Sequence, residues 1–182
     1  MQSLAIILLS VVAAVVYGIV HDQITARICI EYFTMAHPRL IDSESPTVLG
    51  LFWGVVATWW VGLPLGLGLA VAARAGRQPK LTVQHLIQPL LVLLLCMFVV
   101  ATFAGVIGYI TATPELMRRV QPLGSRIPES RHTPFLIDVW AHSASYLAGL
   151  LGGITLWFIT WRRRERQGIV RKPGKVGSDL DI

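Results

Sequence analysis

Charged side chains are scarce in this sequence: only 14% of its 182 residues are Asp, Glu, Lys or Arg. Soluble globular proteins carry about 25% of such residues. Hydrophobic residues instead make up 54% of the chain, and its mean hydropathy is +0.61. The shortage of charge therefore argues against a soluble protein, and the length predicts a single domain.

Cysteine is almost absent as well, since the chain has only Cys29 and Cys96. Two cysteines exclude a disulfide-dense scaffold and a zinc site made of four thiolates. Cys96 lies in the apolar segment LLVLLLCMFVV, where a cysteine behaves as a small hydrophobic residue. Cys29 lies in a polar stretch, so we expect no disulfide bond between the two.

The sequence also lacks a nucleic-acid-binding motif, although its net charge is +6. Its basic residues lie beside apolar runs, which is typical of membrane proteins. We therefore expect the lipid bilayer as a partner and no nucleic acid.

Four apolar segments are long enough to cross a bilayer, which takes about 20 residues of helix. They are residues 3–20, 46–73, 85–110 and 134–161. They predict an all-α membrane protein: residues 1–161 form a four-transmembrane-helix bundle with two polar extracytoplasmic links. Residues 162–182 are predicted to be a basic cytoplasmic tail without fixed structure.

The distribution of Lys and Arg predicts the orientation of the spans. The link between the second and third spans has three such residues and the C-terminal tail has seven, whereas the other two links together have six. The side richer in Lys and Arg faces the cytoplasm. We therefore predict that both termini are cytoplasmic.

Small residues recur at a spacing of four within the spans, as in Gly50 with Gly54 and Gly62 with Gly66. This spacing lets helix backbones approach closely. It indicates either a dimer interface or packing within the bundle, and we favour packing within the bundle. A homo-oligomer or a membrane-protein partner stays an alternative. Pro64 predicts a kink in the second span.

Polar and metal-ligating side chains gather near the two predicted extracytoplasmic links. They are His21, Asp22, Cys29, Glu31, His37, His132, Asp138 and His142. Residues 21–37 fit either a helix that continues the first span or a half-buried strand, because ITARICIEY alternates in polarity. We favour the helix.

On a helix, Arg27 and Glu31 are four residues apart, which predicts a structural ion pair. Alternatively, they pair with Glu129 and Arg131 and so hold the two links together. Either arrangement explains these charges without a catalytic role.

Asp138 and His142 are also four residues apart, at the start of the fourth span. A carboxylate beside an imidazole fixes its tautomer and raises its basicity, as a metal ligand, a proton relay or a general base requires. The same two side chains serve equally well as hydrogen-bonding contacts to the first span, and we favour this structural role.

The histidines also suggest a cofactor. His21, His37 and His142 are candidate ligands of zinc or copper. Haem held by two histidines from different helices is a further alternative. No HxxxH, HExxH, CxxC or CxxCH motif accompanies them. Cys29 with His21 or His37 is a less favoured nucleophilic pair.

The segments YGIVHDQITARICIEYFT and DVWAHSASY, with His37 and Pro38 between them, resemble a recurring pattern in small four-span membrane proteins of bacteria. The resemblance covers residues 17–161. It implies a location in the bacterial inner membrane and no particular activity.

Together these features predict a non-enzymatic binding or structural membrane protein with a face rich in His and acidic residues. One alternative is a metal- or haem-binding redox protein or enzyme that uses the same histidines. Another is a small transporter, which is less favoured because few polar residues lie deep in the spans. The sequence does not decide between an enzyme and a binding protein.

Overall fold

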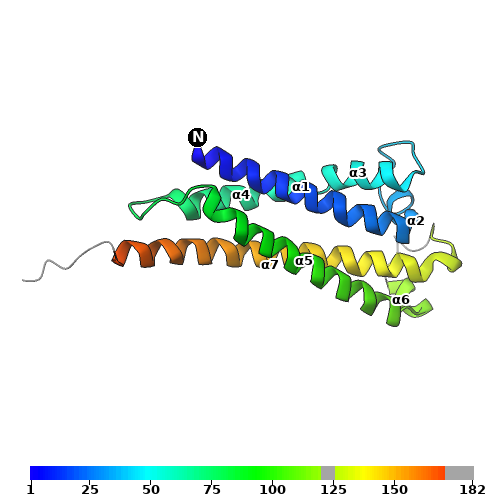
Figure 1. Ribbon diagram of the computed structural model, residues 1–182. Helices are drawn as coiled ribbons and strands as arrows, with labels where there is room; N and C mark the ends of the chain where they lie inside the picture. Colours follow the sequence, from blue (N-terminus) through cyan, green and yellow to red (C-terminus); the bar gives the residue numbers. More distant parts are fainter. Residues whose placement is uncertain (120–125, 171–182) are drawn as a thin grey trace, which may run out of the picture.

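The computed structural model describes residues 1–119 and 126–170, and every regular element in these ranges is helical (Figure 1). In chain order the elements are α1 (Gln2–Ile28), α2 (Ile30–Thr34), α3 (Pro46–Val56), α4 (Trp59–Arg74), α5 (Gln84–Ile110), α6 (Pro114–Arg119), η2 (Glu129–Arg131) and α7 (His132–Val170). Four segments are long and apolar enough to cross a membrane: Gln2–Ile28, Pro46–Arg74, Gln84–Ile110 and Glu129–Ile169. The predicted all-α bundle of four spans is confirmed.

The bundle consists of two helix pairs. Helix α1 packs along α3 and α4, whereas α5 packs along α7. The pairs meet most closely through α4 and α7, and α1 touches α5 and α7 less closely. The N-terminus and the α4–α5 connection lie at one end of the bundle, and α2 and α6 lie at the other (Figure 1). We call the second end, with residues 29–45 and the described residues of 111–131, the link end.

Glycines allow α1 and α4 to lie in backbone contact. A Cβ atom at Gly62 would lie 2.8 Å from the Cα of Val11, and one at Gly66 would lie 2.8 Å from the Cα of Ile7. No side chain fits at such distances unless a backbone moves. The small residues of the second span therefore serve packing within the bundle, as we favoured.

The second span is interrupted at Ala57 and Thr58, whereas Pro64 lies inside α4. The hydroxyl of Thr58 donates a hydrogen bond to the backbone carbonyl of Gly54. A side chain that takes the carbonyl four residues back competes with the helical backbone bonds. The second span is thus broken before Pro64, the residue at which we predicted a kink.

Helix α7 has 39 residues and reaches Val170. At a rise of about 1.5 Å per residue it is about 58 Å long, well beyond the hydrocarbon thickness of about 30 Å. The expected unstructured tail is therefore wrong for residues 162–170, which are helical. Residues 171–182 of that predicted tail lie outside the described residues.

Candidate functional site

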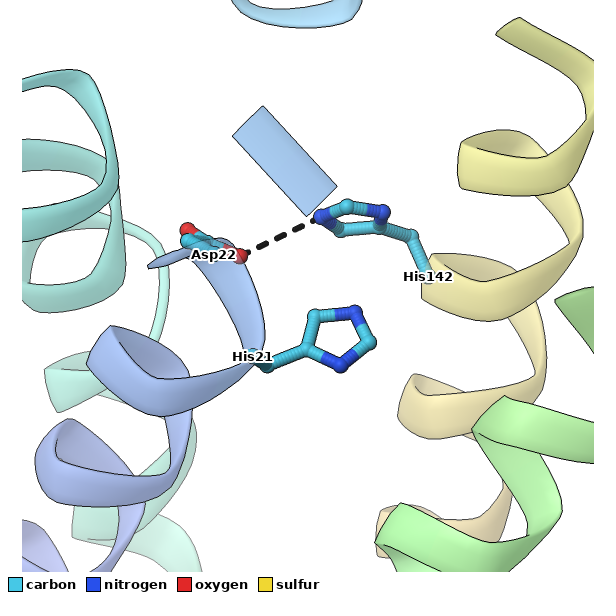
Figure 2. A group of neighbouring side chains, drawn as sticks. All are labelled: His21, Asp22 and His142. Carbon is cyan, nitrogen blue, oxygen red and sulfur yellow. Dashed lines mark hydrogen bonds and ion pairs between the residues drawn. The ribbon is translucent and has the colours of Figure 1, made fainter. Parts of the chain in front are cut away.

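Three of the predicted site residues come together at the seam between the two helix pairs (Figure 2). They are His21 and Asp22 of α1 and His142 of α7, with exposed fractions of 7%, 5% and 7%. One ligand atom from each lies within 4.8 Å of the other two. Because α1 extends to Ile28, His21 and Asp22 belong to the span and not to the link. We call these three residues the His–Asp cluster.

The imidazole of His142 is held at both ring nitrogens. Its Nδ1 lies 2.8 Å from the backbone oxygen of Asp138, and its Nε2 lies 3.2 Å from Oδ1 of Asp22. His142 thus contacts the first span, as we favoured, whereas the carboxylate of Asp138 is not its partner. The ring turns back onto the carbonyl of Asp138, and this directs Nε2 towards Asp22 on the other helix (Figure 2).

Several buried polar atoms at the site have no hydrogen-bond partner among the described residues. They are Nε2 of His21 and both carboxylate oxygens of Asp138, whose side chain is 0% exposed. Most buried polar atoms in proteins are hydrogen-bonded to protein or water. An ion, a water or a ligand would therefore satisfy these atoms.

Two tyrosines enclose the imidazoles. Tyr17 of α1 stacks on His21 with ring centroids 5.8 Å apart, and Tyr32 of α2 stacks on His142 at 4.3 Å. Our sequence interpretation missed both residues. The spacing of Tyr17 and His21 on one helix face was an available signal. Nothing in the sequence indicated that Tyr32 returns to the cluster, because this contact depends on how α2 folds back.

A cavity of about 310 Å³ extends from the cluster into the bundle. Its polar end is formed by His21, Asp22, His142, Tyr17, Ser145 and Tyr146. The hydroxyls of Tyr17 and Ser145 are hydrogen-bonded at 2.8 Å. Its remaining walls are largely apolar and include Leu90, Leu93, Met97 and Trp157.

A second cavity, of about 410 Å³, is lined by residues of α1, α5 and α7 nearer the link end. His21 lines both cavities. The second cavity has a predominantly apolar lining that includes Ile24, Phe98 and Ala101. His21 thus borders both cavities, whereas Asp22 and His142 line only the first.

Two other predicted histidines lie outside the cluster. Nδ1 of His37 lies 2.8 Å from the backbone oxygen of Tyr32, and its ring packs against Trp53 with centroids 4.7 Å apart. Burial lowers the pKa of His37, so its ring is neutral at pH 7. His132 contacts the backbone oxygen of Ile127 through Nε2 at 3.0 Å. The structure therefore groups Asp22 rather than His37 with His21 and His142.

The expected ion pair between Arg27 and Glu31 is wrong. Helix α1 ends at Ile28, and the extended backbone of Cys29 breaks the four-residue spacing. Arg27 instead donates hydrogen bonds to the side chains of Gln23 in α1 and Thr47 in α3. Glu31 binds Arg131, as the alternative interpretation proposed.

Cys29 lies beside this ion pair and is fully buried. Its Sγ donates to Oε2 of Glu31 at 3.3 Å. Burial raises the pKa of the Cys29 thiol to about 12. A thiol with such a pKa stays protonated at neutral pH and is a poor nucleophile. This arrangement disfavours the nucleophilic pair with His21 or His37.

No family model matches this chain, and no curated protein or solved structure matches it.

Proposed function

We propose that this protein is a membrane-embedded binding protein for a small amphiphile with a neutral head that carries carbonyl oxygens. The cavity of about 310 Å³ supports this proposal, because its walls are largely apolar and its polar groups lie at one end. Small-molecule sites typically enclose about 300–1,000 Å³, with a few polar groups that orient the ligand.

The polar end determines which head group fits. The hydroxyls of Tyr17 and Ser145 line it, and because one of them donates to the other, the second keeps a hydrogen for the carbonyl oxygen of a ligand. In the metal-free protein the carboxylate of Asp22 lies at the same end and disfavours an anionic head. A neutral head therefore fits better than a carboxylate or a phosphate.

The ligand would enter from the bilayer. Trp60, Tyr146 and Leu150 line the cavity and are also 55%, 43% and 61% exposed on the outer surface. In a membrane these surfaces face lipid, so the opening is lateral. The apolar part of the amphiphile would follow the walls towards Trp157, and its head would stay near the cluster.

We also propose that the membrane is a bacterial inner membrane and that both termini are cytoplasmic. The excess of Lys and Arg in the α4–α5 connection and after the fourth span supports this orientation. The cavity then has its polar end in the extracytoplasmic half of the bilayer.

Glu44→Cys and Arg77→Cys, each in a background without Cys29 and Cys96, test the orientation with a membrane-impermeant maleimide. Intact cells should label only Cys at position 44, and labelling only at position 77 would reverse the orientation.

Ligand binding is tested by filling the cavity. Ala13 lines it, whereas the neighbouring Val12 is 57% exposed on the opposite side of α1. We would purify the wild type, Ala13→Phe and the control Val12→Phe in mild detergent, and identify retained small molecules by mass spectrometry. Ala13→Phe should lose an amphiphile that the wild type and Val12→Phe retain. Equal retention by all three proteins would refute binding in this cavity.

Added probes test the head group. A decyl-substituted benzoquinone presents neutral carbonyl oxygens, and a long-chain fatty acid presents an anionic head. The quinone should quench tryptophan fluorescence in a saturable manner, because Trp60 and Trp157 line the cavity. The fatty acid should not compete with it. Preferential binding of the fatty acid would overturn the assignment of a neutral head.

A further inference from the structure

The contact between Oδ1 of Asp22 and Nε2 of His142 requires a proton or a cation between these two atoms. Nδ1 of His142 faces a backbone carbonyl at 2.8 Å, and a carbonyl oxygen only accepts, so Nδ1 carries a hydrogen. In a neutral imidazole the other nitrogen, Nε2, is then an acceptor. This acceptor lies 3.2 Å from Oδ1 of Asp22, which is also an acceptor when ionised. Either a proton or a metal cation must join them.

His21 provides the second, independent observation. Its side chain is 7% exposed, yet Nε2 has no hydrogen-bond partner among the described residues. The ring lies edge to face with His142, at a centroid distance of 4.6 Å (Figure 2). A shared proton between Asp22 and His142 would leave this nitrogen unsatisfied, whereas a metal ion bound by all three residues would satisfy it.

The geometry is close to what a metal ion requires. Donor atoms about 2.0–2.1 Å from a tetrahedral zinc ion lie roughly 3.3 Å apart. The pair formed by Asp22 Oδ1 and His142 Nε2 has a separation of 3.2 Å, and all three ligand atoms lie within 4.8 Å of one another. An approach of the His21 ring to this pair would complete a three-ligand set.

The surroundings of His142 resemble those of many metal-bound histidines. Such a histidine usually donates its second ring N–H to a carboxylate or a backbone carbonyl, which fixes the tautomer and presents the free nitrogen to the metal. The carbonyl of Asp138 has this role here. Haem does not fit, because the contacting rings of His21 and His142 leave no space for a porphyrin between them.

We infer that His21, Asp22 and His142 bind one first-row transition metal ion of the zinc class, with an open coordination position facing the cavity. Two imidazoles and one carboxylate suit zinc, and three protein ligands leave a fourth position for water or another ligand. This site goes beyond the proposed binding of an amphiphile and does not depend on it.

The test uses the full chain, purified in detergent without a histidine tag and stripped of metal by a chelator. Zinc binding is measured by equilibrium titration and elemental analysis, and Co²⁺ serves as a spectroscopic probe. The wild type should bind about one ion per chain, and Co²⁺ should show the intense visible absorption of a four-coordinate site. His142→Asn, His21→Gln and Asp22→Asn should each weaken binding at least about ten-fold.

Two histidines outside the cluster provide matched controls. His132→Asn and His85→Asn should leave the affinity and the Co²⁺ spectrum unchanged. Equal affinity in the cluster variants and these controls would show a different or adventitious site and overturn the inference. Absence of stoichiometric binding to the wild type would also overturn it and leave a proton shared by Asp22 and His142.

Folding and ligand binding are separated from metal binding in the same experiment. Circular dichroism and size-exclusion chromatography check that each variant is folded. If a cluster variant fails to fold, the wild-type stoichiometry and Co²⁺ spectrum still decide the question. Retention of the amphiphile is measured on the metal-free wild type, so its loss would refute the proposed function without affecting the metal site.

Discussion

Arg131 binds Glu31 through Nε, which lies 2.9 Å from Oε1 and 3.0 Å from Oε2 of the carboxylate. A second donor of the same guanidinium, Nη2, lies 3.1 Å from the backbone oxygen of Ile28, where α1 ends. These contacts join residues that are 100 and 103 positions apart in the sequence. They connect α2 and the end of α1 with η2, which directly precedes α7, so the ion pair helps to hold α1 against α7.

The first prediction concerns pH. Burial alone would raise the pKa of Glu31. Hydrogen bonds from its own backbone, Arg131 and Cys29 have the larger combined effect, so the pKa lies below its ordinary value of 4.5. A carboxylate whose pKa is lower in the folded state stabilises the fold above its unfolded pKa and loses this contribution as pH falls through the folded value. The wild type should therefore be more stable than Glu31→Gln at pH 7, by about 1–2 kcal/mol.

The difference should shrink as the pH falls below about 4.5, the ordinary value for a glutamate. Thermal unfolding of both proteins in detergent, from pH 7 to pH 3.5, measures it. The double variant Glu31→Gln with Arg131→Gln shows how much of the difference belongs to the pair. A stability difference that stays constant over this range would contradict the titration of Glu31.

A second contact between distant segments secures the opposite end of the bundle. Arg164 of α7 is only 1% exposed and donates to the backbone oxygens of Ala72, Ala75, Gln78 and Pro79. The last carbonyls of a helix have no partner within the helix. Arg164 satisfies carbonyls at the end of α4 and so ties the fourth span to the second.

The second prediction follows from this contact. Arg164→Ala should lower the free energy of unfolding by at least about 2 kcal/mol, because it leaves buried carbonyls without a donor. The exposed neighbour Arg163 provides the matched control, and Arg163→Ala should change stability by less than about 0.5 kcal/mol. Denaturant or thermal unfolding of the purified proteins distinguishes them. Equal effects of the two substitutions would argue against the capping role.

The spans could be predicted because a bilayer imposes a long, uncharged helix on each of them. The length and hydropathy of each apolar segment were enough to predict the four spans. They were not enough for the break at Thr58, because the hydroxyl of Thr58 competes for a carbonyl while Pro64 is accommodated within α4. They also failed for residues 162–170, which continue the last helix and place Arg164 in contact with backbone carbonyls after α4 and at its end.

The candidate residues of the site were identified because ionisable side chains near the ends of spans are rare. Their pairing could not be deduced, since it depends on how α1 and α7 face each other. The four-residue spacing suggested Asp138 as the partner of His142, but the imidazole binds the backbone of Asp138 instead. The spacing suggested Arg27 as the partner of Glu31, but the extended backbone at Cys29 separates them.

The third prediction concerns the reactivity of Cys29. Its side chain is fully buried, and burial raises its pKa to about 12. Because the thiolate is the reactive form, Cys29 in a Cys96→Ala background should resist N-ethylmaleimide at pH 7.5 until the protein is unfolded. Glu44→Cys, at an exposed position of the same link, should react within minutes in a background without either native cysteine. Rapid labelling of native Cys29 would show that the link end opens.

The fourth prediction compares the two buried aspartates. Neither carboxylate oxygen of Asp138 has a hydrogen-bond partner among the described residues, whereas Asp22 is paired with His142. Replacing a buried polar group that has no partner by an apolar group of similar size is often neutral or stabilising, but removing one member of a pair leaves the other unsatisfied. Asp138→Leu should therefore leave the unfolding temperature unchanged or raise it.

Asp22→Leu, by contrast, should lower the free energy of unfolding by about 1–3 kcal/mol because Nε2 of His142 loses its partner. Thermal unfolding of the metal-free proteins keeps the comparison independent of any bound ion. The opposite order, with Asp138→Leu the less stable variant, would mean that the carboxylate of Asp138 has a partner in solution. Elemental analysis and mass spectrometry of the wild type would then show whether an ion or a small molecule occupies the space beside it.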